Sequence, residues 1–421
     1  MNVAYRQVSS PMHDERTLAA PPKMEAANSQ ELMRVNAALD AVLDYSEAQG
    51  WRGFDKHDAL NSPFLWTFCG WSRVTRLLAV QAVMRSPVNL RPVLATLRTF
   101  NPKGLALFMR GLLDRYALDG DQRHLARLRT LLGQLDAMVV VTPSGGRAWG
   151  YQYPWQDLGF FAPRGTPNAV VTAFVCEALL AAHRQLGEPE LLSRVEAAIP
   201  FFLGDLQHLK DEPEELCLSY MPLSMTMRVL DVSILVASVL AQFARQSNQP
   251  QWFEPARRLA CYVVRRQTDY HAWFYTDPPG DSPIRHDNYH TGFILDALSS
   301  YMDASGERQW QSQYDAGLAF YAEHLFEPGG APRWMSDRAY PYDIHGAAQG
   351  ILTFSRHMET HGDLARRIAG WALDEMYNPE GRFYHQRTRW YTKKFTQLRW
   401  CNAWMVRALA AYAQGIHREV D

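Results

Sequence analysis

The densest group of ionisable side chains lies directly before an apolar, helix-like segment near residue 290. It consists of Arg285, His286, Asp287, Asn288, Tyr289 and His290. A second group precedes the next such segment and consists of Tyr340, Tyr342, Asp343 and His345. Two carboxylates that face one cleft serve as general acid and base in glycosidic-bond cleavage, and their separation decides between inversion and retention. We therefore predict Asp287 and Asp343 as the catalytic pair of a glycoside hydrolase-like site. The residues expected to assist them are Tyr289, His290, His286 and His345.

The same neighbourhood also suits a different reaction. In a uronate polysaccharide lyase or a C5-epimerase, Tyr289 or His290 would move a proton beside the sugar carboxylate, and Asp287 would only orient it. A third interpretation is structural, because aspartate at the start of a helix commonly caps it by accepting backbone N–H bonds. The residue types alone leave all three interpretations open.

Long loops rich in Trp, Tyr, Arg, His and Asp precede the apolar segments, and long ordered loops in a compact domain are usually functional. Aromatic planes interleaved with polar groups suit a sugar-binding cleft. The candidate substrate-binding residues are Tyr151, Tyr153, Trp155, Gln156, Asn168, Arg285, Arg333, Trp334, Tyr340, Tyr342, Arg399 and Trp400. Trp390 belongs to the same aromatic group. The alternative is that these rings only fill the wide end of the fold.

A repeat must position these loops. Five apolar segments at helical spacing begin near Asn168, Asp231, Asp287, Asp343 and Asn402, at intervals of 56 to 63 residues. Their polar first residues suit helix N-caps. Amphipathic helices are expected between them, over 190–205, 254–267, 311–324 and 363–377, and a further pair over 104–116 and 121–137. With residues 30–49 as the sixth outer helix, the pattern predicts an all-α fold, an (α/α)6 toroid of helical hairpins with the loops on one face. We expect one domain over 30–421 after a flexible leader, 1–29.

Charge and composition exclude several classes of protein. With 43 basic and 44 acidic residues the formal net charge is -1, and without basic runs no nucleic-acid binding is expected. The longest nearly apolar run, 232–244, is too short for a transmembrane segment. The N-terminus lacks the apolar centre of a secretory signal, so we expect a cytoplasmic protein. Five scattered cysteines without a CxxC pair indicate neither disulfides nor a sulfur-rich zinc site.

Cofactor motifs are missing as well. The HDNYH sequence supplies metal-ligand types but is not a zinc signature, and HExxH, GxGxxG and GxSxG do not occur. We expect no metal and no cofactor.

Two earlier segments can contribute to the site: 51–63 is polar and could close one side of the mouth. The other, 88–104, holds Arg91, Arg98 and Lys103, which either face an acidic ligand or are solvated helix charges.

The repeat over 30–416 resembles the α/α-toroid enzymes of polysaccharide metabolism, which include unsaturated glucuronyl hydrolases, glucuronyl C5-epimerases and heparinase-type lyases. The segments GFDKHDALNSP, NLRP, WGYQYPWQ, GTPNAVVTAF and HDNYHTGFILDAL are similar to uncharacterised bacterial proteins found with polysaccharide-biosynthesis genes. The resemblance implies a carbohydrate-active enzyme with a saccharide substrate, in surface-glycan production, and possible association with polysaccharide-assembly enzymes. A non-catalytic glycan-binding or assembly protein is the second class. An isoprenoid cyclase is a remote third, since its DxDD motif is absent and fold alone does not settle function.

Overall fold

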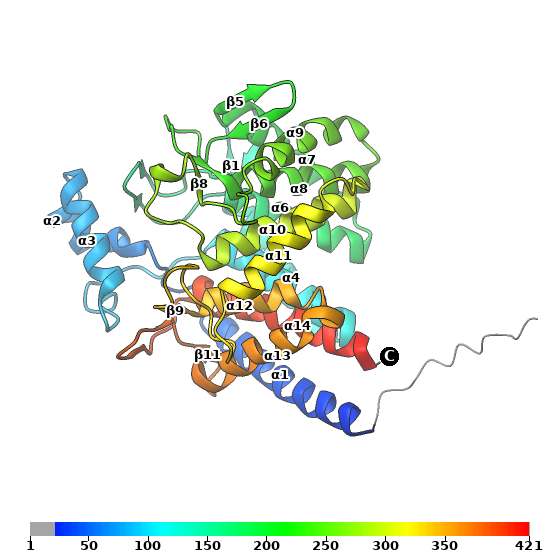
Figure 1. Cartoon of the computed structure of the whole chain (residues 1–421). Helices are drawn as coiled ribbons and strands as arrows, with labels where there is room; N and C mark the ends of the chain where they lie inside the picture. Colours follow the sequence, from blue (N-terminus) through cyan, green and yellow to red (C-terminus); the bar gives the residue numbers. More distant parts are fainter. Residues whose placement is uncertain (1–21, 421) are drawn as a thin grey trace, which may run out of the picture.

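A ring of inner helices forms the centre of the molecule in the computed structural model, which describes residues 22–420 (Figure 1). The inner helices are α4 (Pro102–Asp119), α6 (Ala169–Leu186), α8 (Leu230–Ser247), α10 (Asn288–Ser305), α12 (Ile344–Phe354) and α14 (Trp404–Val420). Each packs against the next along the chain, and α14 packs back against α4. The ring is therefore closed, and the predicted all-α toroid is confirmed.

An outer helix packs against each inner helix. The outer helices are α1 (Pro22–Ala48), α5 (Gln122–Asp136), α7 (Pro189–Glu196), α9 (Phe253–Val264), α11 (Gln311–His324) and α13 (Met358–Glu375). The first of them, α1, packs against the last inner helix, α14, as the sequence predicts. It begins at Pro22 instead of residue 30, and the rest of the expected leader, 1–21, lies outside the described residues together with Asp421.

Side-chain caps explain where several inner helices begin. The side chains of Asn168, Asp287 and Asp343 accept backbone N–H bonds from the first turns of α6, α10 and α12. The caps expected at Asp231 and Asn402 are wrong. Asp231 lies inside the first turn of α8, because the helix already begins at Leu230. The extended residues 228–229 pair with 276–277 and end just before it. Asn402 lies in the π-helical turn Leu398–Ala403 and binds the backbone of 381–383.

Short antiparallel strands lie in the connections that lead from outer to inner helices. The pairs are β1 (Val140–Val141) with β2 (Arg147–Ala148), β3 (Trp155–Gln156) with β4 (Phe161–Ala162), β5 (His208–Glu212) with β6 (Glu215–Leu218), β7 (Arg228–Val229) with β8 (Thr276–Asp277), and β10 (Tyr377–Asn378) with β11 (Arg382–Phe383). A three-stranded sheet has the order β13 (Thr392–Lys393), β12 (Gln386–Arg387), β9 (Tyr342–Asp343). These connections end at the N-termini of the inner helices, so the loops gather at one mouth of the ring.

Two further helices, α2 (Pro63–Cys69) and α3 (Arg73–Arg85), stand apart from the ring between α1 and α4 (Figure 1). The repeat pattern gives no sign of them. They enclose a small apolar core of their own, made by Ala59, Leu60, Ala79, Val80 and Val83. They form a separate projection beside the mouth.

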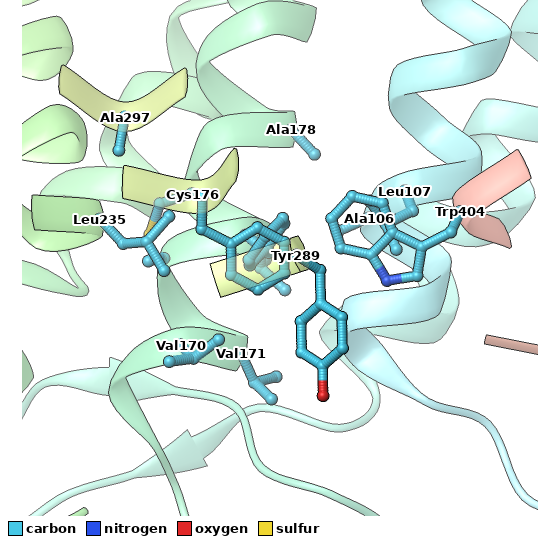
Figure 2. Close-up of a cluster of buried hydrophobic side chains, with 14 of the residues drawn as sticks. Ala106, Leu107, Val170, Val171, Cys176, Ala178, Leu235, Tyr289, Ala297 and Trp404 are labelled. Carbon is cyan, nitrogen blue, oxygen red and sulfur yellow. The ribbon is translucent and has the colours of Figure 1, made fainter. Parts of the chain in front are cut away.

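One helix of the described residues, α6, is long and apolar enough to cross a membrane by length and composition alone. It is an inner helix of the ring, and two thirds of it is buried there. Figure 2 shows its residues Val170, Val171, Cys176 and Ala178 meeting Leu235, Ala297 and Trp404 of other inner helices. Its apolar composition is explained by this core.

Candidate functional site at the mouth of the ring

Asp287 and His290 form a hydrogen-bonded pair at the start of α10. The Oδ2 atom of Asp287 lies 2.8 Å from Nδ1 of His290, and the Asp287 side chain is 2% exposed. A carboxylate accepts hydrogen bonds, so Nδ1 of His290 carries the proton of this bond. In the neutral imidazole the lone pair is then on the other ring nitrogen, Nε2. This is the arrangement of a histidine base oriented by a carboxylate.

Asp343 lies at the corresponding position of α12 and has a different role. Its Oδ1 accepts the indole N–H of Trp400 at 2.8 Å, and its Oδ2 accepts the side-chain amide of Gln386 at 2.7 Å. It also caps α12 through the backbone N–H of His345. The ammonium group of Lys56 lies 3.9 Å from Oδ2. With all these partners, Asp343 holds Trp400 and Lys56 in place at the mouth.

His345 and Tyr289 stack on each other in an aromatic box. Their ring centroids are 4.5 Å apart and nearly parallel, and the rings of Trp400 and Trp404 lie 4.5 and 4.4 Å from His345. Neither ring nitrogen of His345 has a hydrogen-bond partner within 22–420. Burial, aided by the charge of Lys103, lowers the pKa of His345 well below 6.5, so the imidazole is neutral at pH 7.

Tyr289 keeps its proton, because burial raises its pKa well above 10 and nearby Asp287 adds to the effect. Its hydroxyl points away from the apolar side chains of the inner helices (Figure 2). The mouth therefore holds a protonated phenol beside a neutral imidazole. Such a pair can donate and accept a proton without carrying net charge.

Two lysines, the partly buried Lys56 and the buried Lys103, lie at the same end of the ring. Nζ of Lys56 is 3.9 Å from the centre of the Trp400 ring, and Nζ of Lys103 is 3.9 Å from that of Phe174. Burial lowers the pKa of both amines, against the attraction of Asp343 on Lys56 and of Asp231 on Lys103. Lys103 is 3% exposed, so it is not a solvated helix charge.

The segments before the ring behave in part as the sequence predicts. In the polar segment 51–63, Oδ2 of Asp55 accepts a hydrogen bond from Nε of Arg399 at 2.6 Å. This bond fixes the segment as one wall of the mouth. Within 88–104, Arg91 is buried and pairs with Asp58, whereas Arg98 is exposed. Neither arginine faces the centre of the mouth with a free charge.

Sequence reasoning missed two buried groups of the mouth. Asp231 is 2% exposed, and its Oδ1 has no hydrogen-bond partner among the described residues. Burial raises the pKa of its carboxyl, although His290 and Lys103 oppose the shift. The repeat register, which pairs Asp231 with Asp287, could have identified it. His385 is fully buried 3.9 Å from Asp343, and burial lowers its pKa. No sequence signal marked it.

The aromatic residues of the first long loop pack against one another. Tyr151 and Tyr153 stack at 5.3 Å, and Trp155 meets Tyr151 edge-on. These rings are buried and form the wall of the mouth. Gln156 accepts a bond from Arg76 and donates to backbone carbonyls, and Asn168 caps α6. Their role as sugar-binding residues stays a prediction.

The remaining predicted residues lie toward the outer rim. His286 binds the Tyr270 hydroxyl and the Trp273 carbonyl, and its ring packs against Phe320 of α11. The other rim residues make the following contacts: Arg285 with Asp337, Arg333 with Glu327, Trp334 with Arg338, Tyr340 with Tyr342, and Tyr342 with Trp371 of α13. The predicted set therefore divides into a central group around Asp287 and Asp343 and an outer group.

A cavity of about 450 Å³ lies at the opposite end of the ring, toward the C-termini of the inner helices. Phe174, Phe293 and Trp404 line it and separate it from Lys103. Its polar lining includes Arg110, whose pKa burial lowers to about 9, and Asp296, which accepts a bond from Gln349 at 2.7 Å. We place the candidate site at the mouth, because the oriented histidine and the box around His345 lie there. No group of three or more His, Cys, Asp or Glu side chains in 22–420 is placed to hold a metal ion.

Comparison with known proteins shows what this geometry resembles. No protein-family model matches the chain, and no curated protein matches it in sequence. Among solved structures, cellobiose 2-epimerase from Spirochaeta thermophila is similar with a TM-score of 0.62 and 13% identity, covering 95% of this chain and 100% of that one. This chain is an α/α toroid.

Two more solved structures share the fold. An unsaturated glucuronyl hydrolase specific for heparin has a TM-score of 0.60 at 13% identity, covering 93% of this chain and 98% of its own. The GH76 α-mannanase of Bacteroides thetaiotaomicron has a TM-score of 0.56 at 13% identity, covering 76% of this chain and 86% of its own. The structural neighbours are α/α-toroid carbohydrate-active enzymes, as the sequence resemblance indicates, and at these identities the likeness shows the fold.

Proposed function

We propose that the protein is a carbohydrate-active enzyme that moves a proton at a carbon atom of a saccharide, as an epimerase or a lyase does. His290 is the base, Asp287 orients it, and Tyr289 with His345 supplies the second proton carrier. Lys56 stabilises the negative charge that develops on the substrate when the proton leaves. The reaction is general acid–base catalysis, in which histidine is the most frequent proton carrier.

The observation that carries this proposal is the 2.8 Å bond from Nδ1 of His290 to Asp287. It leaves Nε2 of His290 as a base and uses the Asp287 carboxylate for orientation. Oδ1 of Asp287 has no hydrogen-bond partner among the described residues, whereas both oxygens of Asp343 accept bonds, from Trp400 and Gln386. Both predicted carboxylates thus serve to position other groups, which favours proton transfer over hydrolysis by the Asp287–Asp343 pair.

The substrate in this proposal is a bacterial surface saccharide or its precursor. Support comes from the neighbours, whose names specify cellobiose epimerisation, mannose isomerisation and cleavage of unsaturated glucuronyl groups. A cytoplasmic location is part of the proposal, since all five cysteines are free thiols, as a reducing compartment leaves them. Association with polysaccharide-assembly enzymes remains a hypothesis from the sequence resemblance.

The test compares variants on a panel of cellobiose, mannose and glucuronate-ended oligosaccharides. Epimer formation, 232 nm absorbance and new reducing ends are measured for wild type, His290→Gln and Asp343→Asn. We expect wild type to form either an epimer or a product that absorbs at 232 nm. The rate of that reaction should fall by about 10²- to 10⁴-fold in His290→Gln. His324→Gln, an exposed histidine of outer helix α11, is the matched control. New reducing ends that persist in His290→Gln would contradict the proposal.

A second candidate, glycoside hydrolysis, is favoured by one observation at Asp231. Its carboxyl has a pKa raised by burial, so it can act as a general acid, with Asp287 as the second carboxyl group. In that case Asp231→Asn abolishes the release of reducing ends, and no epimer is formed. The same panel therefore distinguishes the two candidates.

A further inference from the structure

The projection formed by α2 and α3 exposes large apolar side chains to solvent. Phe68 is 62% exposed, Trp71 75% and Leu78 65%, and Phe64 and Val74 are similarly exposed. None of the residues of α2 is buried. Phe64 and Phe68 also contact each other, with ring centroids 4.8 Å apart. Large apolar side chains exposed in such number on two successive helices are unusual on a free globular domain and mark an interaction site.

The charge of this projection has one sign. No Asp or Glu occurs between residues 59 and 113. Arg73 and Arg85, at the two ends of α3, are exposed. Aromatic side chains with arginines and without acids are the pattern of segments that lie at a membrane–water interface.

A second element adds to the same surface. The tip between β12 and β13 carries Trp390, 82% exposed, with the guanidinium of Arg389 5.1 Å from its ring centre. The neighbouring Lys394 is exposed, and no acidic residue occurs between 381 and 418. Nζ of Lys393 donates to the backbone carbonyl of Met84 at 2.9 Å, which ties this hairpin to the last turn of α3. The hairpin that carries Trp390 thus lies against the C-terminal end of α3, and Trp71 directly precedes the N-terminal end of the same helix.

We propose that this surface, made by α2, α3 and the tip 388–391, docks the protein on an anionic lipid bilayer. Phe68, Trp71 and Trp390 enter the interfacial region, and the arginines and Lys394 bind lipid phosphates and anionic headgroups. A second copy of this chain is disfavoured as the occupant. A two-fold contact would set one surface bearing Arg73 and Arg85 against an identical surface, and neither α2, α3 nor the tip 388–391 holds an acid to neutralise these cations.

Docking would place the mouth of the ring close to the bilayer. Nε of Arg76, on α3, donates to Gln156 in the loop wall at 2.8 Å, and the Trp66 ring stacks on Phe161 of β4 at 6.1 Å. The projection is therefore fixed to the mouth wall by contacts from both helices. This inference does not depend on which reaction the mouth performs.

The test is sedimentation of the full chain with vesicles of phosphatidylcholine, alone or mixed with phosphatidylglycerol. Wild type is expected to bind the mixed vesicles, with affinity that falls as salt rises. The double variant Phe68→Ser/Trp71→Ser should lose binding to the mixed vesicles. Arg73→Gln/Arg85→Gln should weaken binding to the mixed vesicles by roughly 30-fold, because each cation near an anionic surface contributes about fivefold.

The matched controls are Val141→Ser, an equally exposed apolar side chain on β1, and Arg123→Gln, an exposed arginine on α5. All substitutions are at exposed positions, and thermal unfolding checks that each variant is folded. Binding by the Phe68→Ser/Trp71→Ser variant at wild-type strength would overturn the proposal. So would failure of wild type to bind either vesicle, or a wild-type dimer in solution that the same variant abolishes while vesicle binding is absent.

Discussion

The carboxylate of Asp287 does two things at once: it caps α10, and it holds Nδ1 of His290 at 2.8 Å. The two roles can be separated by substitution. Asparagine caps a helix as well as aspartate does, but it carries no charge to hold the protonated Nδ1.

Asp287→Asn should therefore retain stability and lose activity. We expect kcat to fall by about 10²- to 10⁴-fold while the free energy of unfolding changes by less than about 0.5 kcal/mol. Asp287→Ala should lose activity to the same degree and about 1 kcal/mol of stability, because the cap is gone. Steady-state kinetics and urea unfolding measure both. An Asn variant with wild-type kcat would show that the carboxylate is only a cap.

The buried Asp55–Arg399 pair is expected to control the stability of the mouth. Burial raises the pKa of Asp55, but the Arg399 guanidinium outweighs it and holds that pKa at about 2. Asp55→Ala should cost about 3–5 kcal/mol, since it leaves a buried charge unpaired. The double variant Asp55→Leu/Arg399→Met should recover most of that loss.

Urea unfolding checks this prediction, with the exposed pair Arg34–Asp374 as the control. Asp374→Ala should change the free energy of unfolding by less than about 1 kcal/mol. An Asp55→Ala variant as stable as Asp374→Ala would contradict the structural role of the pair.

Buried neutral histidines should make the fold sensitive to acid. Burial lowers the pKa of His57 to about 3 and that of His345 well below 6.5. Below pH 6.5 the unfolded chain takes up protons at these sites and the folded chain does not, so stability falls as the pH drops toward 3. Each such histidine contributes a slope of about 1.4 kcal/mol per pH unit.

The measurement is the free energy of unfolding between pH 7 and 5 for wild type and His345→Gln. The free energy of unfolding of the variant should fall less steeply as the pH drops, because its unfolding takes up about one proton fewer than that of wild type. Parallel curves for the two proteins would mean that His345 is protonated in the folded state.

Substitution of Lys103 tests whether this buried amine serves the activity of the protein or the stability of its fold. Its amine is buried against Phe174 and Phe293, where methionine of similar length fits without a polar group. Lys103→Met should raise the free energy of unfolding by about 1 kcal/mol and lower activity, as is common when a functional polar group is removed. Thermal unfolding and turnover are measured together. A less stable variant would show that Lys103 serves the fold.

The ring could be predicted from the sequence because its signal is periodic. The five apolar segments recur at intervals of 56 to 63 residues. Three of their polar first residues, Asn168, Asp287 and Asp343, cap their helices. Helices α2 and α3 could not be predicted from the repeat. They lie outside it, and several of their large apolar side chains face solvent instead of the core of the ring.

The site was predictable only in part for a related reason. Asp287 and Asp343 are marked by their place in the repeat, whereas Lys56 and His385 come from irregular loops and reach Asp343 through tertiary packing. His286 stands next to Asp287 in the sequence, yet its ring lies against α11. Neighbouring residues at the start of a helix point in different directions, so sequence proximity could not assign them to one site.

The most direct test of the account is solvent exchange during turnover. Wild type is incubated in D₂O with the saccharide panel, and deuterium at carbon in recovered substrate and product is measured by mass spectrometry. Proton transfer by His290 predicts one carbon-bound deuterium per turnover if the reaction is an epimerisation, or 232 nm absorbance without it if the reaction is an elimination. Either signal should be absent in His290→Gln and unchanged in His324→Gln. Turnover that yields product without any carbon-bound deuterium and without 232 nm absorbance would contradict the account.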